Sequence, residues 1–500
     1  MVIKSIGIIG TGPSGIAALY EFLHTNSDGT TSVGSAASTD RQFTKVVAFE
    51  QKSKAGGIWA TSLDKADYLV PPQALLDTEQ YNDPNVIHPG QKPPADLAGE
   101  TLEKVKRKEN IEANELEWKR SGVFEALFTN VPYRFTKFSY QKENPEFLDR
   151  SRQYYPFLSH GELGGNLEKI IEDEGLDEHI RYHSTVEDVV KKNGKWVVTV
   201  KQNDPIKGED YWYQEEFDAV VICNGHYTVP YLPHINGLAQ YNQNFPDSLL
   251  HAKSYRSPKD FEDKSVLVVG GSVSSANIVQ HIFPFAKKIT SSRRGPSPVF
   301  EWVNLILDDK DIHPKPGIEK FDSTSGVVHF KDGLEEKFDK IVLCTGYHYH
   351  YPFLRNLLKV ANFSHASCVR GLYQHTFSIE DPTLGIVGVA SSPLTFHSVE
   401  AATAALAGVW SGAKSLPPKE EQVEWEQARF DSSISTRTFH FYDYRDIKSE
   451  LIDHLVPFFP HGRPNPLEVD IKNVEDVTEG YEKLVDLFYL LKKSPIHLET

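Results

Sequence analysis

Cysteine is scarce in this chain of 500 residues. The three cysteines are Cys223, Cys344 and Cys368, and no two of them form a C-x-x-C pair. This spacing argues against a metal knuckle and against a redox-active dithiol, so we expect no metal site. So few cysteines also fit a reducing compartment.

Long apolar runs are missing as well. No run approaches the roughly 20 residues that a membrane-spanning helix needs, and a strand begins so close to Met1 that no secretion signal fits before it. We therefore expect no transmembrane segment and a cytoplasmic protein, with peripheral association with an internal membrane left open.

Positive charge is outnumbered, because 53 Lys and Arg residues stand against 69 Asp and Glu residues, a net charge of −16. An acidic surface argues against nucleic acid as a partner. The hydrophobic share of 39% is that of an ordinary globular protein, and the length indicates two or more domains.

The first informative motif lies near the N-terminus. Residues Ile3–Ile9 form an apolar run of strand length, and Ile16–Leu23 has the pattern of a helix. Between them lies a G-x-G-x-x-G turn, which consists of Gly10, Thr11, Gly12, Pro13, Ser14 and Gly15. A strand, this turn and a helix open a dinucleotide-binding unit, in which free N–H groups at the helix start hold the phosphates.

A second strand, Lys45–Glu50, ends on an acid. In such a unit this acid takes the ribose hydroxyls, usually about 20 residues after the glycines. The gap is longer here because residues 24–42, rich in Ser, Thr, Gly and Asp, read as a flexible surface insertion. The remaining candidates on this side of the site are Gln51, Gly57, Ile58, Trp59 and Val186.

A second nucleotide unit follows the strand Lys264–Val269, with a helix expected over 276–282. Its turn supplies Gly270, Ser272, Ser274 and Ser275 as phosphate-binding candidates, with serines in place of the second and third glycines. Arg293 and Arg294 follow the next strand, where a ribose 2′-phosphate would be bound, which favours NADPH over NADH.

Two strand-to-glycine turns, 217–225 and 340–347, repeat one pattern after the two units. The fold class predicted is therefore α/β with two Rossmann-type domains, the second inserted into the first. We expect the first domain over 1–226 and 339–500 and the inserted domain over 227–338. We also expect a charged helix over 102–118 and a C-terminal helix over 481–492 that docks on the protein.

These motifs together resemble the flavin-containing monooxygenases, and most closely the fungal type. The F-x-G-x-x-x-H-x-x-x-[YF] motif of that family is matched by Phe245, His251 and Tyr255, between the two nucleotide turns. Further similar stretches are Phe49-Glu50 with Gly56–Trp59, Thr129-Asn130, Cys344–Tyr347 and Leu372–Phe377. Asp247 replaces the motif glycine, and we expect the local turn to differ because aspartate adopts a positive φ less easily. Ser272 adds a side chain at the second turn, where affinity for NADPH falls unless its hydroxyl binds a phosphate.

The resemblance implies FAD and NADPH as cofactors and dioxygen as co-substrate. NADPH reduces the flavin, dioxygen adds at its C4a position, and the hydroperoxide passes its distal oxygen to a soft sulfur or nitrogen nucleophile. Thr129 and Asn130 would lie beside the flavin and nicotinamide, with the Asn130 amide as the catalytic candidate. The expected partners of the protein are dioxygen and a small nucleophilic substrate. A second copy of the chain in a homodimer is left open.

Several alternatives stay open. An NADPH oxidase or an inactive flavin-binding scaffold would carry the same motifs, with Asp247 and Ser272 as marks of decay. A siderophore-type amine N-hydroxylase is a lesser alternative. A disulfide reductase pairs the same cofactors but needs two nearby cysteines, and ketone-oxidising relatives carry tryptophan where this chain has Tyr255.

Overall fold

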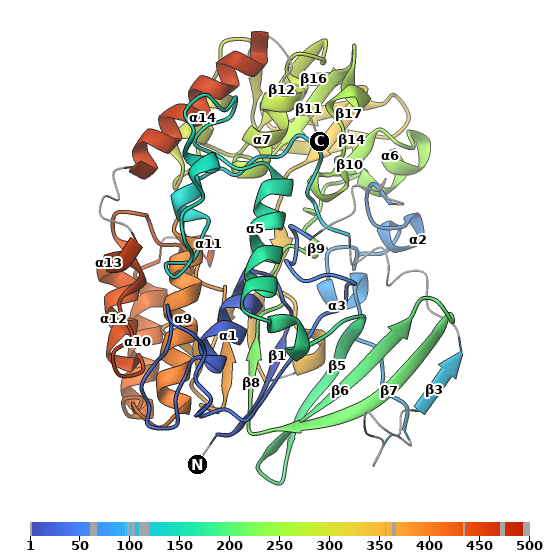
Figure 1. The fold of residues 1–500 in the computed structure, drawn as a ribbon. Coiled ribbons are helices and arrows are strands. Elements are labelled where there is room, and N and C mark those ends of the chain that lie inside the picture. Colours follow the sequence, from blue (N-terminus) through green and yellow to red (C-terminus); the bar gives the residue numbers. More distant parts are fainter. Residues whose placement is uncertain are drawn as a thin grey trace.

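The chain folds into two α/β units, which Figure 1 shows one above the other with the N-terminus at the lower end. The computed structural model describes residues 3–60, 68–95, 97, 101, 106–109, 120–355, 357–362, 367–433, 436–470 and 476–493. No helix among these residues has the length and apolar character needed to cross a membrane.

The first unit is built on a seven-stranded sheet in which five neighbouring strands are parallel. In sheet order the strands are β21 (Leu372–Tyr373), β22 (Phe377–Ser378), β23 (Leu384–Ile386), β8 (Ala219–Ile222), β1 (Ser5–Ile9), β2 (Lys45–Phe49) and β4 (Ile180–Arg181). Ile9 pairs with Phe49 on one side and with Ile222 on the other. These three strands end level with one another, so the residues that follow them meet at one edge of the sheet.

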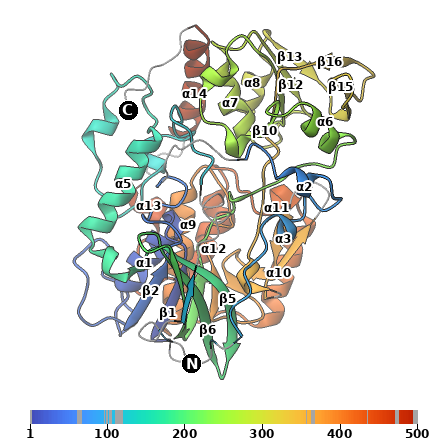
Figure 2. The ribbon, with the colours of Figure 1, turned by 90° about the vertical axis from the view of Figure 1, so that its right-hand side faces the viewer.

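Two layers cover the faces of this sheet. Helices α1 (Pro13–Leu23) and α9 (Thr395–Trp410) pack together on the face that receives Ile6 and Ile8. The opposite face meets an antiparallel sheet rich in Val, Tyr and Trp, the residue types that favour strands (Figure 2). Its strands are β3 (Lys106–Glu109), β7 (Glu209–Phe217), β6 (Lys195–Asp204) and β5 (Ser184–Lys192).

Strand β3 falls within residues 102–118, for which the sequence predicted a helix. The prediction is wrong for Lys106–Glu109, because their backbone pairs with β7. Cross-strand hydrogen bonds, which charge patterning does not reveal, decide the conformation there. The other residues of that range lie outside the described part of the chain.

The second unit has a five-stranded, fully parallel sheet. Its strands, in sheet order, are β10 (Leu249–His251), β17 (Lys340–Leu343), β11 (Ser265–Val269), β12 (Lys288–Ser292) and β13 (Ile312–Lys315). Helices α7 (Val273–Ile282) and α8 (Glu301–Leu307) share one apolar core with this sheet. Strand β17 lies between β10 and β11, so this sheet extends past the domain boundary expected at residue 338.

The second unit is inserted into the first, as the sequence predicted. The two connections between the units are short strands, β9 (Val229–Pro230) and β18 (Tyr347–His348), which pair antiparallel. The chain therefore leaves and re-enters the first unit at the same place.

Helix α14 (Asp476–Lys493) returns to the second unit (Figure 1). Its apolar side chains, which belong to the core around α7 and α8, are Leu484, Leu487, Phe488 and Leu491. Lys492 forms ion pairs of 2.6 Å with both Asp309 and Asp311. The predicted docking of this helix on the protein is confirmed: its C-terminal part packs on the inserted unit, and Val477 near its start lies in the core of the first unit.

Two loop expectations have different outcomes. The insertion at 24–42 is folded back on the protein, with backbone bridges between Asn26 and Arg41 and between Thr30 and His461. Asp247 adopts a φ of +65°, so the turn expected to differ keeps the conformation that glycine favours. Aspartate is one of the few side chains that visits this region, and Lys340 Nζ donates to its carbonyl oxygen at 2.6 Å.

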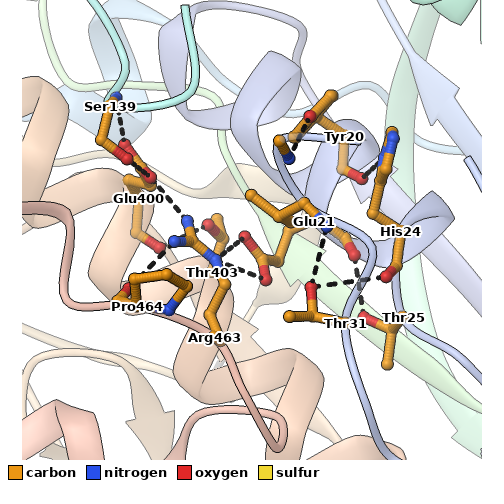
Figure 3. Close-up of polar contacts among 12 residues, drawn as sticks. Tyr20, Glu21, His24, Thr25, Thr31, Ser139, Glu400, Thr403, Arg463 and Pro464 are labelled. Carbon is orange, nitrogen blue, oxygen red and sulfur yellow. Dashed lines mark hydrogen bonds and ion pairs between the residues drawn. The ribbon is translucent and has the colours of Figure 1, made fainter. Parts of the chain in front are cut away.

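Charged groups are buried between α1, α9 and the segment before the C-terminal helices (Figure 3). Arg463 donates to both carboxylate oxygens of Glu21 at 3.1 Å and to Glu400 at 2.5 Å, and each of the three side chains is only 1% exposed. The hydroxyl and the N–H of Ser139 also donate to Glu400. One guanidinium thus serves two buried carboxylates, and burial raises the pKa of Glu21 to about 6.

Arg463→Met is expected to lower the free energy of unfolding by about 3–5 kcal/mol, because it leaves two buried carboxylates without their cation. Glu21→Gln tests the pH dependence. The folded pKa of Glu21 lies above the ordinary 4.5, so its stabilising contribution is complete below pH 4.5 and is lost as the pH rises through 6.

Urea unfolding between pH 4 and 7 measures both effects. The stability of the parent relative to Glu21→Gln should fall by about 2 kcal/mol between pH 4 and 7, while Glu168→Gln, at a side chain 46% exposed, should follow the parent. A constant difference across this range would contradict the raised pKa.

Candidate functional site

The turn after β1 brings three glycines to the common edge of the first sheet. Gly10 has a φ of +94°, and a Cβ built on it would lie 2.7 Å from the carbonyl oxygen of Cys223. A Cβ on Gly15 would lie 2.0 Å from the carbonyl oxygen of Gly10. A Cβ on Gly12, in contrast, would meet only Gly57, at an ordinary 3.5 Å, and its φ of −68° suits any residue. The protein's own packing therefore requires glycine at 10 and 15 but not at 12.

The helix after this turn starts earlier than the sequence predicted. Pro13 takes the first helical position of α1, where its missing N–H leaves no helical hydrogen bond unmade. Ser14 lies beside Gly388, since a Cβ on Gly388 would be 2.6 Å from the serine Oγ. The free N–H groups of the first helical turn point toward the edge of the sheet.

Glu50 follows β2 at the same edge and is 4% exposed. Its Oε2 accepts hydrogen bonds from the N–H of Thr11 at 3.0 Å and from its hydroxyl at 2.6 Å. Its Oε1 accepts from the N–H of Lys52 at 2.9 Å. Three donors therefore hold the carboxylate beside the first turn, with Gln51 next to it and half-buried.

The Gly56–Trp59 turn lies directly on the glycine turn. Gly57 has a φ of +62°, and a Cβ on it would be 2.8 Å from Gly12 Cα. Ile58 and Trp59 are half-buried, and Trp59 lies against Gly164 of α5 (His160–Asp173). The structure thus brings Gln51, Gly57, Ile58 and Trp59 together beside the first turn. The Val186 side chain, on β5, is buried in the core that also contains Phe49 of β2.

Asn130 lies where the chain passes from one unit to the other. Before it, Phe124 and Phe128 contact the His281 ring of α7 at 5.2 and 5.5 Å between centroids, and after it Val131 enters the core of the first unit. Buried Thr129 holds this passage, because its hydroxyl donates to Val131 O at 2.8 Å and accepts from Leu158 N–H at 3.2 Å.

The two residues of this pair therefore differ in role. The Asn130 side chain is half-buried and forms no hydrogen bond with the part of the chain that the structure describes. Thr129 positions the loop, and the Asn130 amide stays free of hydrogen bonds to the described residues at this passage between the units.

The second turn repeats the first with different residues. Gly270 has a φ of +134°, and a Cβ on it would lie 2.3 Å from Cys344 O. Ser272 is the N-cap of α7, and Ser274 lies in its first turn; both are half-buried. Ser275 is fully buried against Gly270, so of the three serines only Ser272 and Ser274 lie where a phosphate would be bound.

The two arginines after β12 also differ in their surroundings. The Arg293 guanidinium pairs with Asp308 and donates to Asn304 Oδ1 at 3.3 Å, and its side chain is 11% exposed. Arg294 is exposed and forms no ion pair among the described residues. Burial raises the pKa of the neighbouring Tyr231, and the Arg294 guanidinium offsets part of that shift.

A cavity of about 450 Å³ lies between the units beside this arginine loop. Asn304, which holds Arg293, lines it on one wall, and Arg429 and Tyr442 line the other. Such a volume is in the range of small-molecule sites. None of the residues predicted to bind the cofactors lines this cavity.

The sequence analysis assigned no role to a chain of buried histidines at the same edge. Val369 N–H donates to His440 Nε2 at 2.9 Å, so His440 carries its proton on Nδ1 and donates to His375 Nδ1 at 3.1 Å. His375 then donates from Nε2 to the hydroxyl of Tyr442 at 3.0 Å. Burial lowers the pKa of His375 to about 3, so both rings are neutral and fix the turn that contains His375.

The cysteines of the described residues lie apart from one another. All three cysteines are free and buried, and burial raises the pKa of the Cys344 thiol to about 12. Among the residues that the structure describes, no group of three or more His, Cys, Asp or Glu side chains is arranged to hold a metal ion.

Comparison with known proteins gives consistent matches. The flavin-binding monooxygenase-like family model matches residues 113–306 and 301–458. The chain is 29% identical to flavin-containing monooxygenase FMO GS-OX5 of Arabidopsis thaliana, over 84% of this chain and 76% of that protein. It is 27% identical to trimethylamine monooxygenase of a Roseovarius species, over 83% and 77%.

Among solved structures, S-allyl-L-cysteine S-oxygenase of Allium sativum aligns over 99% of both chains. The TM-score is 0.69 and the sequence identity 23%. At this identity the likeness concerns the fold.

Proposed function

This chain belongs to the flavin-binding monooxygenase-like family, and we propose that it binds FAD in the first unit and NADPH in the second and oxygenates soft sulfur or nitrogen nucleophiles. It is a flavin-dependent monooxygenase, an oxidoreductase. The name of one relative supports the nitrogen substrates, since it is a trimethylamine monooxygenase.

The free space beside Gly12 is the single observation that carries the FAD assignment. The protein's own packing leaves room for a side chain there, whereas a pyrophosphate that approaches the backbone at the helix start does not. Glu50 supports the assignment, because a buried carboxylate beside the same turn suits ribose hydroxyls. The first unit therefore fits the dinucleotide from its phosphates to its adenosine end.

The second unit fits NADPH in the same way. Ser272 and Ser274 carry hydroxyls beside the free N–H groups of α7, and both hydroxyls and N–H groups donate to phosphate oxygens. Arg294, unlike Arg293, has no carboxylate partner among the described residues, so its guanidinium is available to a 2′-phosphate.

Bound FAD would accept a hydride from NADPH and activate dioxygen for transfer of one oxygen atom to the substrate. The chain's own residues would bind and orient the cofactors and keep water from the reacting centre. The glycine turns would hold the two cofactors at the edges of their sheets, and Asn130 would offer an uncharged amide where the chain passes between the units. A neutral amide adds hydrogen bonds there without a fixed charge.

The deciding experiment measures product and hydrogen peroxide per NADPH consumed, with a panel of thiols, thioethers and amines. We expect NADPH consumption to yield an oxygenated sulfur or nitrogen product. Complete conversion of the electrons to peroxide, whatever the nucleophile, would favour the NADPH oxidase. A protein that binds flavin but consumes no NADPH would favour the scaffold.

Gly12→Val should abolish flavin binding while the apoprotein still folds. The variant should purify colourless, because the side chain fills the space proposed for the pyrophosphate. Gly161→Val is the matched control, since a Cβ at Gly161 meets nothing within 4 Å. Visible absorption and thermal melting measure both, and a Gly12→Val protein with normal flavin content contradicts the site.

Arg294→Ala should raise the KM for NADPH roughly ten- to a hundredfold, as expected for the loss of a charge-assisted hydrogen bond. The KM for NADH should change little. Arg293→Ala is the comparison, because its guanidinium is already paired with Asp308. We expect that variant to change the ratio of the two KM values less. Equal effects of Arg294→Ala on both cofactors would refute its 2′-phosphate role.

Asn130→Ala should retain FAD and release more peroxide per NADPH, because water reaches the reacting centre more easily once the amide is removed. Coupling efficiency, the product formed per NADPH, measures the effect. Asn242→Ala, which removes an amide that hydrogen-bonds Gln73 away from the crevice, should keep the parent's coupling. Unchanged coupling in Asn130→Ala would leave this residue without the assigned role.

A further inference from the structure

Lys52 lies shortly after β2, and its ammonium group forms no ion pair with a carboxylate among the described residues. It is half-buried, and its Nζ donates instead to the carbonyl oxygen of Gly57 at 2.7 Å and lies 3.4 Å from that of Ala60. Burial lowers the pKa of Lys52 and the nearby Glu50 raises it. A charged donor is thus directed to the backbone of one particular turn.

The backbone of Lys52 holds the other parts of the same site. Its N–H donates to Glu50 Oε1 at 2.9 Å, and its carbonyl accepts from His183 N–H at 3.0 Å. The next N–H, of Ser184, donates to the carbonyl of Glu50 at 2.8 Å. One residue therefore joins the end of β2, the start of β5 and the Gly56–Trp59 turn.

The turn that Lys52 anchors lies on the glycine turn itself. Gly56 N–H donates to Thr11 O at 2.8 Å, and Gly57 approaches Gly12 so closely that a Cβ on it would be 2.8 Å from Gly12 Cα. Displacement of Gly57 would move the backbone beside both Gly12 and Glu50.

We propose that Lys52 is a positioning residue for the adenosine diphosphate half of the cofactor in the first unit. Its ammonium holds the Gly57 turn over Gly12, and its N–H orients the carboxylate of Glu50. The inference rests on the proposed FAD site and adds a residue that acts on the ligand through its neighbours. All its contacts lie on the diphosphate and ribose side, so ADP alone should report on them.

The test titrates apoprotein with ADP, with FAD and, for the second unit, with NADP⁺. Lys52→Met keeps the length of the side chain and removes the ammonium group. It should weaken ADP and FAD by the same factor, about tenfold or more, as expected for loss of a charged donor. NADP⁺ binding should be unchanged, and Lys52→Arg should restore most of the affinity.

Lys54→Met is the matched control, because Lys54 lies two residues further on, is 69% exposed and pairs only with Glu168 at 3.2 Å. It should bind ADP like the parent. Unchanged ADP affinity in folded Lys52→Met overturns the inference, and so does equal loss of ADP and NADP⁺ binding, which would indicate general unfolding. If the parent binds neither ADP nor FAD, the proposed flavin site fails and this inference fails with it. If the parent binds both ligands and Lys52→Met binds them equally well, the proposed flavin site is retained and only the role of Lys52 is refuted.

Discussion

The contact on which both units depend is the approach of a glycine to a bare carbonyl oxygen of the neighbouring strand end. Gly10 meets Cys223 O in the first unit, and Gly270 meets Cys344 O in the second. A Cβ on these glycines would lie 2.7 and 2.3 Å from the carbonyl oxygens, so no side chain fits between turn and strand. Each helix can therefore start directly at the edge of its sheet, where its free N–H groups face outward.

Much of this could be predicted from the sequence because the information is local. An apolar run, glycines at fixed spacing and a helical pattern lie within about twenty residues of one another in each unit, and steric rules at Gly10 and Gly15 act within the turn. The insertion of one unit in the other followed from the repeated order of these motifs. The assignment of β17 could not follow, because its sheet membership depends on pairing with β11, more than seventy positions earlier.

The parts that escaped prediction depend on distant or non-local contacts. Charge patterning could not show that Lys106–Glu109 pairs with β7. The choice between Arg293 and Arg294 depends on Asp308, a partner directly after α8. The histidine chain joins residues 65 and 71 positions apart. At Asp247 the expected change of the turn is wrong, because aspartate adopts the left-handed region there, with a φ of +65°.

The return of α14 to the inserted unit has a consequence for the order in which the protein can be completed during synthesis. The inserted unit is contiguous in sequence, yet its α7–α8 surface is covered by a helix that begins about 130 residues after its last sheet strand. As the chain leaves the ribosome from its N-terminus, that apolar surface stays uncovered while the rest of the first unit is made. The final helix closes both units at once, so a nascent chain truncated shortly before it exposes to chaperones a surface that the finished protein hides.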